Sequence, residues 1–208
     1  MKRRTTFFHR KPLRLLLCLL MITGALGLVS CSSSEEEDFT TVSIMKDGTV
    51  KSHISESFEQ PYYDKDGLQQ SVLSEAASYN RTAGQNHVTV EKVEMAENQI
   101  IVEMTYAEAE DYAAFNQVIF FVGTPGEAEA EGYDLNVVLS DVKDPQATVG
   151  KADILAMKDV QLLITDIPET VLLNGRVLYS DDGVAVSGNR KSCTLKDESE
   201  GPAYIIFK

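Results

Sequence analysis

Short apolar runs, each followed by a turn signal, fill the stretch from residue 160 to residue 208 of this chain. The runs are rich in β-branched and aromatic residues, which favour strands. Between them lie Asn174-Gly175, Asp181-Asp182-Gly183 and Ser187-Gly188-Asn189, whose residue types suit tight turns. Repeated hairpin signals at this spacing predict an antiparallel meander within residues 144–208. The expected strands are Val160–Thr165, Thr170–Leu173, Arg176–Tyr179, Val184–Val186, Ser192–Leu195 and Ala203–Phe207.

Two further hairpins are expected before residue 107. Their paired runs are Thr41–Met45 with Thr49–Ser55, and His87–Met95 with Gln99–Tyr106. The first pair surrounds the turn Lys46-Asp47-Gly48. In the run that begins at His87, the apolar positions change phase, which predicts a bulge near Glu91-Lys92.

A helix is expected between these hairpins, over Gly67–Arg81. Asp66 can cap its start, with Gln69 three residues later, and Gly84 lies just beyond its end. One apolar stripe follows the helical period. The stripe consists of Leu68, Val72, Ala76 and Tyr79.

The segment from residue 108 to residue 143 carries signals of both kinds. A short helix is expected over Glu108–Phe115, and the run Val118–Val122 is apolar on both faces, which predicts a central strand. Thr124-Pro125-Gly126-Glu127 is a capping box that starts another helix, and Leu135–Leu139 is a weaker strand signal. The sequence therefore predicts an α+β, β-rich fold: an α+β part over 42–143 and an antiparallel β part over 144–208, as two domains or as one.

The first thirty residues have the three parts of a secretory signal. Six basic residues precede the apolar run Leu15–Val29, and small residues lead to Cys31. The run is short for a stable membrane span, which needs ~20 apolar residues. We therefore expect the chain to be exported and residues 1–30 to be removed.

The boundary Leu28-Val29-Ser30-Cys31 resembles the lipobox of bacterial lipoprotein precursors. The resemblance implies lipid (diacylglycerol) on the Cys31 sulfur, cleavage between Ser30 and Cys31, and attachment to the extracytoplasmic face of the cell membrane. Two acyl chains give stable anchoring. Residues 31–41 are polar and acidic, which predicts a flexible tether. An ordinary signal peptide or an uncleaved anchor is the alternative.

The net charge of the residues that follow the signal limits the classes of molecule that can be partners. The chain has 19 basic and 32 acidic residues, and six of the basic ones precede Cys31, so the remainder carries 13 against 32, or −19. This argues against nucleic acid as a partner and favours solubility or a cationic partner. Of the cysteines, Cys18 leaves with the signal and Cys31 is lipidated, so Cys193 has no partner for a disulfide.

The folded part also resembles uncharacterised lipoproteins of Gram-positive bacteria. The resemblance rests on Asp111-Tyr112, Phe115-Asn116, Phe121-Val122-Gly123-Thr124, Glu127-Ala128, Gly132-Tyr133-Asp134 and the ending Tyr204–Lys208. It implies a Gram-positive cell envelope and brings no activity with it.

Two groups of residues are candidate sites. Asp181 and Asp182 can ligate calcium if their turn meets Asp197, Glu198 and Glu200, although Asp-Gly turns form without metal. Tyr62 and Tyr63, beside Pro61, can form an aromatic contact for sugar or peptide, or can pack at the edge of the core.

Recognised catalytic motifs are missing from the sequence. His53 and His87 lack the spacing of a zinc site, and the chain contains neither a Gly-x-Ser-x-Gly elbow nor a P-loop. We therefore expect a non-catalytic binding, adhesion or envelope-assembly module that has no cofactor and whose partner is an envelope protein or a glycan. The alternative is a carboxylate-dependent hydrolase of cell-wall or glycan polymer, because paired acids can cleave glycosidic bonds.

Overall fold

The hairpins expected near the start of the folded part form in the computed structural model, which describes residues 39–58, 64–96, 98–196 and 201–208. β1 (Thr41–Ile44) pairs with β2 (Val50–Ser57), and Asp47 closes their turn by accepting hydrogen bonds from the N–H and hydroxyl of Thr49. β3 (Val88–Ala96) pairs with β4 (Gln99–Tyr106), and the register shifts between Val90 and Lys92. The predicted bulge is therefore confirmed.

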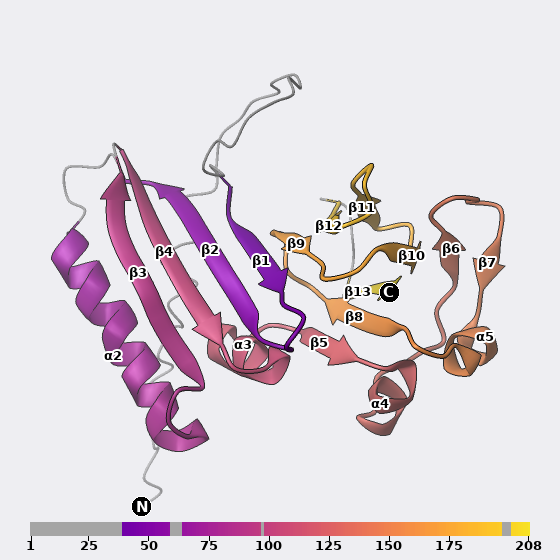
Figure 1. Ribbon diagram of the computed structural model, residues 1–208, viewed down its shortest axis with the longest axis horizontal. Helices are drawn as coiled ribbons and strands as arrows, with labels where there is room; N and C mark the ends of the chain where they lie inside the picture. Colours follow the sequence, from indigo (N-terminus) through magenta and orange to yellow (C-terminus); the bar gives the residue numbers. More distant parts are fainter. Residues whose placement is uncertain (1–38, 59–63, 97, 197–200) are drawn as a thin grey trace, which may run out of the picture. The chain divides into compact units, whose positions relative to one another are not determined.

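Two sheets are built from the strands of the described residues (Figure 1). Sheet A has the order β11-β12-β9-β1-β2-β4-β3, and sheet B has the order β5-β8-β13-β10-β6-β7. The remaining strands of sheet A are β9 (Thr170–Leu172), β11 (Val184–Val186) and β12 (Ser192–Leu195). The strands of sheet B are β5 (Phe120–Gly123), β6 (Leu139–Asp141), β7 (Thr148–Val149), β8 (Gln161–Thr165), β10 (Val177–Ser180) and β13 (Ala203–Phe207). The molecule is α+β and β-rich, as predicted.

The strands after residue 144 form where they were expected, but they do not follow one another as a meander. β8, β10 and β13 belong to sheet B, whereas β9, β11 and β12 join sheet A. β9 pairs with β1 in parallel, across more than a hundred residues of sequence. Ser187-Gly188-Asn189 joins the paired strands β11 and β12, as predicted, but Asn174-Gly175 and Asp181-Asp182-Gly183 connect strands of different sheets and are not hairpin turns. The partner of a strand depends on which core its apolar face can join, and no local signal contains that information.

Helices cover the sheets in two places. α2 (Lys65–Ala83) runs along β3 and buries Val72 and Ala76, while α3 (Ala109–Asn116) follows β4 (Figure 1). α4 (Pro125–Ala130) begins at the predicted capping box of Thr124 and Glu127. α5 (Lys151–Ala156) buries Ile154. The helix expected over 67–81 begins two residues earlier because Asp64, not Asp66, accepts the capping hydrogen bond from the Gly67 N–H.

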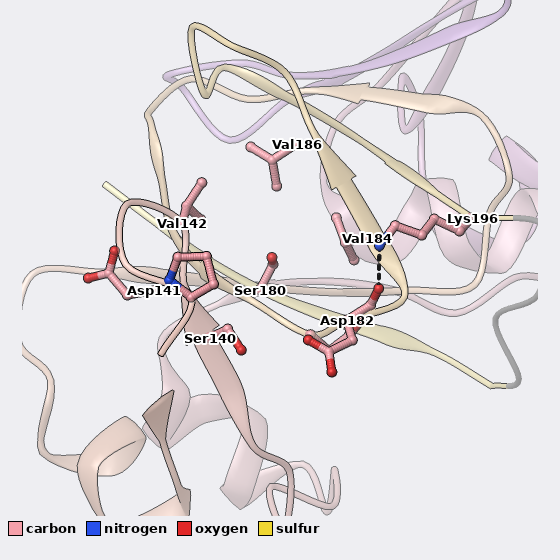
Figure 2. A pocket seen from close by; sticks show the side chains of 10 residues that line it. Ser140, Asp141, Val142, Ser180, Asp182, Val184, Val186 and Lys196 are labelled. Atoms are coloured by element: carbon pink, nitrogen blue, oxygen red, sulfur yellow. Dashed lines mark hydrogen bonds between the residues drawn. The ribbon is translucent and has the colours of Figure 1, made fainter. Parts of the chain in front are cut away.

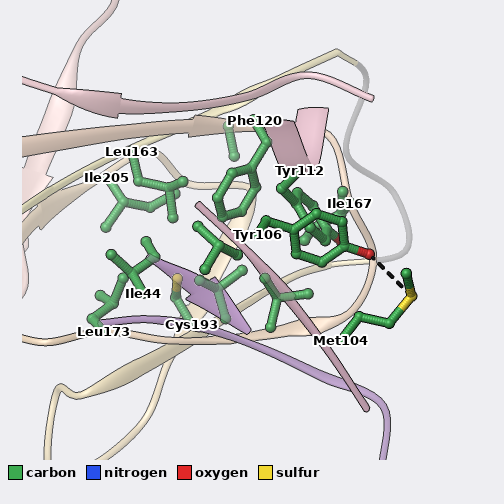
Figure 3. Close-up of a cluster of buried hydrophobic side chains, with 14 of the residues drawn as sticks. Ile44, Met104, Tyr106, Tyr112, Phe120, Leu163, Ile167, Leu173, Cys193 and Ile205 are labelled. Carbon is green, nitrogen blue, oxygen red and sulfur yellow. Dashed lines mark hydrogen bonds between the residues drawn. The ribbon is translucent and has the colours of Figure 1, made fainter. Parts of the chain in front are cut away.

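Sheet B is buried on both faces. One face packs against sheet A, where Leu163 and Ile205 meet Ile44 and Cys193 (Figure 3). On the other face, Ile206 belongs to a second cluster with residues of α4 and α5. The molecule is therefore layered, with sheet B between sheet A and two short helices, and its core lies on both sides of β8 and β13.

Two strand predictions in the middle of the chain were wrong in detail. The segment predicted as a central strand is β5, which lies at the edge of sheet B, although Phe120 and Phe121 are buried on its opposite faces. Apolar residues on both faces of a strand indicate that both faces are covered by other elements. They do not indicate that the strand has a neighbouring strand on each side. Leu135 is fully buried, but the strand in this region is Leu139–Asp141.

The opposite face of sheet A is polar. The strand registers align one residue from each strand into a row across the sheet. The row is Ala185, Thr194, Thr170, Thr41, His53, Glu103 and Lys92.

Within the described ranges, no helix is long and apolar enough to cross a membrane.

Candidate functional site

The predicted calcium ligands Asp181 and Asp182 line a small cavity of about 190 Å³ at the end of β10 (Figure 2). Val142, Val184 and Val186 form an apolar wall, and Ser180 lies at its foot. The volume is below the ~300–1,000 Å³ of a typical ligand site. This cavity can accept a small group only.

The Asp181 carboxylate is already engaged in hydrogen bonds with the backbone. Its two carboxylate oxygens accept hydrogen bonds from the N–H groups of Tyr204 (2.7 Å) and Gly183 (2.9 Å). Burial raises the pKa of Asp181, although these hydrogen bonds oppose the shift. The carboxylate thus fastens the end of β10 to β13, which is a structural role.

The neighbouring acids give no metal site in the part of the chain that the structure describes. Asp141 accepts hydrogen bonds from two backbone N–H groups, and Lys196 Nζ donates to the backbone carbonyl of Asp182 at 2.6 Å. No three acidic, histidine or cysteine side chains converge there. Asp197, Glu198 and Glu200, the other proposed calcium ligands, lie outside the described residues. Calcium binding stays a prediction.

The other predicted site residues also lie outside the described ranges. These are Ser30 and Cys31 at the expected cleavage and lipidation point, and Tyr62 and Tyr63 at the expected aromatic contact. Lipidation and aromatic binding stay predictions.

A larger cavity lies where the parallel strands β1 and β9 end. Its volume is about 510 Å³, within the range of ligand sites. We call it the β1–β9 groove, and its lining residues are Ser43, Ile44, Met45, Lys46, Asp47, Leu172, Leu173 and Asn174. Ile44 and Leu173 are buried, whereas Met45 is 37% exposed, so the groove combines a fixed apolar floor with an accessible wall.

The turn residues hold the walls of the groove together. Asn174 Nδ2 donates to the Met45 carbonyl at 3.0 Å. Hydrogen bonds from Thr49 lower the pKa of Asp47, so this carboxylate stays charged and engaged with the turn. The sequence alone does not reveal this site, because each wall resembles an ordinary turn. Only the parallel pairing of β1 with β9 brings the two walls together.

The sequence pattern also does not reveal a half-buried histidine that is paired with a buried aspartate. His87 Nδ1 lies 2.9 Å from Asp111 Oδ1, and Tyr79 donates its hydroxyl hydrogen bond to the same oxygen at 3.0 Å. Asp111 is 6% exposed. Burial and this hydrogen bond raise the pKa of Tyr79 to about 12. The carboxylate ties α3 to α2 and to the start of β3, and it orients the His87 ring as a catalytic aspartate would.

Glu56 and Glu169 form a carboxylate pair at the other end of sheet A. Burial and the neighbouring charge of Glu169 raise the pKa of Glu56. The Oε2 atom of Glu169 is buried and has no hydrogen-bond partner among the described residues. The pair lines neither of the two cavities.

Comparison with known proteins gives no relative: no family model, curated protein or solved structure matches this chain.

Proposed function

We propose that this chain is an extracytoplasmic lipoprotein whose folded part is a non-catalytic binding module, with the β1–β9 groove as its binding site. The supporting observation is the composition of the groove. It has the volume of a ligand site, its buried floor consists of Ile44 and Leu173, and the half-buried Leu172 adds to its apolar lining. An apolar floor with few polar groups is typical of recognition sites.

The same lining argues against catalysis in the groove. Its titratable side chains are Lys46 and Asp47, and the Asp47 carboxylate already accepts two hydrogen bonds from Thr49. General acid–base catalysis needs a free group within hydrogen-bond reach of the substrate, so the engaged Asp47 carboxylate is poorly suited to that role. The groove therefore suits binding without turnover.

In-cell photo-crosslinking tests the binding role. We expect a photoreactive residue in place of Met45 to give a discrete covalent adduct in the native envelope. The matched control is Val138, which is more exposed, at 67%, and lies outside the groove. Leu172→Glu should abolish the adduct because it places a charge in the apolar lining of the groove. The same adduct from position 138, or none from position 45, would contradict the proposal.

The anchor is tested separately. Cys31→Ser removes the thiol that would receive the lipid, so we expect an unprocessed precursor or a protein released from the membrane. Labelling with radioactive palmitate and cell fractionation measure both effects. Normal processing and lipid incorporation in the variant would remove the lipoprotein assignment.

One observation favours the carboxylate-dependent hydrolase as a second candidate. Paired acids in different environments are the arrangement that glycosidases use, and the pKa of Glu56 is raised beside Glu169. A hydrolase of this kind should release soluble fragments from cell-wall polymer. Glu56→Gln and Glu169→Gln should each abolish that release, and an unchanged rate would exclude this pair.

A further inference from the structure

Basic residues gather around the β1–β9 groove although the chain is strongly acidic. We call this group the basic rim, and it comprises Lys46, Lys51, Arg176, Arg190, Lys191 and Lys208. The rim contains six of the 13 basic residues that follow Ser30, against 32 acidic residues in the same part. This concentration at one end is unexpected for a chain whose remainder is negative.

Backbone contacts connect the rim to the groove. Lys46 lines the groove, and Lys51 pairs in register with Ser43, another lining residue. Leu173 N–H donates to the Lys191 carbonyl, and Arg176 and Lys208 exchange two backbone hydrogen bonds. Lys46 therefore lines the cavity, and the other rim residues lie on backbone segments that border it.

Most of these cations are open to solvent. Lys46, Lys51, Arg176 and Lys191 are exposed, and within the described ranges none of the four forms a salt bridge. Among the described residues, Asp47 lines the groove and Asp159 lies beside a rim residue. Asp47 is held by Thr49, and Asp159 lies 3.9 Å from Lys208 Nζ. Lys46, Lys51, Arg176 and Lys191 therefore offer exposed positive charge on the segments that border the groove.

We propose that the β1–β9 groove docks a short acidic peptide segment of a partner protein, with one large apolar side chain in the groove and flanking carboxylates on the basic rim. This inference rests on the proposed binding function. The apolar floor requires an apolar anchor, and the rim requires negative charge beside it. A long polyanion does not fit, because it would meet the acidic remainder of the surface.

A peptide that contains tryptophan can test this proposal by fluorescence, because the chain itself has no tryptophan. The probe is the blocked peptide Glu-Glu-Trp-Glu-Glu, titrated with the purified full chain while the tryptophan fluorescence is recorded. We expect a blue shift that saturates, weakens as salt is added, and is competed by Glu-Glu-Leu-Glu-Glu but not by Glu-Glu-Ser-Glu-Glu. Lys-Lys-Trp-Lys-Lys should not bind.

Charge reversal locates the binding. Lys46→Glu with Lys51→Glu should weaken the peptide at least about tenfold. The matched double variant, Lys65→Glu with Lys143→Glu, changes the net charge equally at residues outside the rim and should bind as the parent does. Equal loss in both variants, equal binding of the basic peptide, or binding to phosphatidylglycerol vesicles in place of the peptide would overturn the inference. An in-cell adduct at position 45 without peptide binding would overturn this inference alone and leave the proposed function standing.

Discussion

At the scale of single residues, the buried polar groups form contacts that the sequence pattern does not predict. His87 was assigned to a strand pattern, yet its ring binds Asp111, which lies 24 residues later. Burying a charged carboxylate is costly unless it is hydrogen-bonded. The pair is thus expected to stabilise the contact of α3 with α2 and β3. No spacing rule relates these two positions, because a loop and two strands separate them.

Removal of the His87 ring should therefore destabilise the fold. We expect His87→Ala to lower the free energy of unfolding by about 1–3 kcal/mol, because Asp111 loses a charge-assisted partner while it stays buried. Urea denaturation measures the change. The matched control is His53→Ala, whose ring lies 3.6 Å from a Glu103 carboxylate that is 42% exposed and can be rehydrated, so this substitution should cost less than about 1 kcal/mol. Equal costs would contradict the structural role of His87.

Glu56 gives a prediction in pH. Its folded-state pKa is raised, so the folded state binds the proton more tightly than the unfolded state. The resulting stability is complete below the unfolded pKa and is lost as pH rises through the folded pKa. Glu56→Gln should accordingly be more stable than the parent at neutral pH and should match it in acid.

Thermal unfolding between pH 3 and pH 7 measures this difference. The matched control is Glu94→Gln, since Lys92 lowers the pKa of Glu94 and the effect should have the opposite sign. A pH-independent difference between Glu56→Gln and the parent would show that the carboxyl does not titrate in this range.

At the scale of elements, the local signals predicted most of what formed. The Thr124–Glu127 capping box starts α4, and the C-terminal strands begin and end within about two residues of their expected bounds. These features depend on neighbours in sequence. Three features were predicted wrongly because they depend on tertiary packing. Asp64, not Asp66, caps α2, β5 lies at an edge of sheet B, and the C-terminal strands are divided between the two sheets. The β1–β9 groove depends on tertiary packing in the same way.

The turn before β10 is an element whose glycine is required by a distant strand. A Cβ atom at Gly175 would lie 2.6 Å from the carbonyl carbon of Lys208, closer than real side chains approach. Gly175→Ala should therefore cost about 1–3 kcal/mol, because the backbone at the end of β13 must move. Gly188→Ala is the control, as its Cβ would meet nothing within 4 Å. Chemical denaturation of both variants checks this, and similar stabilities would refute it.

At the scale of the whole molecule, the two sheets share one core. Phe207 and Ile205 of sheet B lie in the same cluster as Val42 and Val102 of sheet A. Loss of packing on one sheet should therefore be felt by the other. The apolar runs and turn signals predicted a β-rich fold, but they do not indicate which surfaces meet.

Truncation of one side chain tests this shared core. Phe207 is fully buried, so Phe207→Ala should cost about 3–5 kcal/mol and should raise hydrogen exchange in β1 and β2 as well as in β8 and β10. Phe39, which is 68% exposed, is the matched control, and its replacement by alanine should leave exchange unchanged. Faster exchange confined to sheet B would mean that the sheets unfold separately.

The position of β13 has a consequence for the order of events in synthesis. β13 follows β8 and β10 in the chain, yet it lies between them in sheet B. Sheet B therefore cannot be completed until residues 203–207 have been made. If the chain is exported, as we propose, late completion of sheet B helps to keep the chain unfolded for translocation. Sheet B then forms on the far side of the membrane.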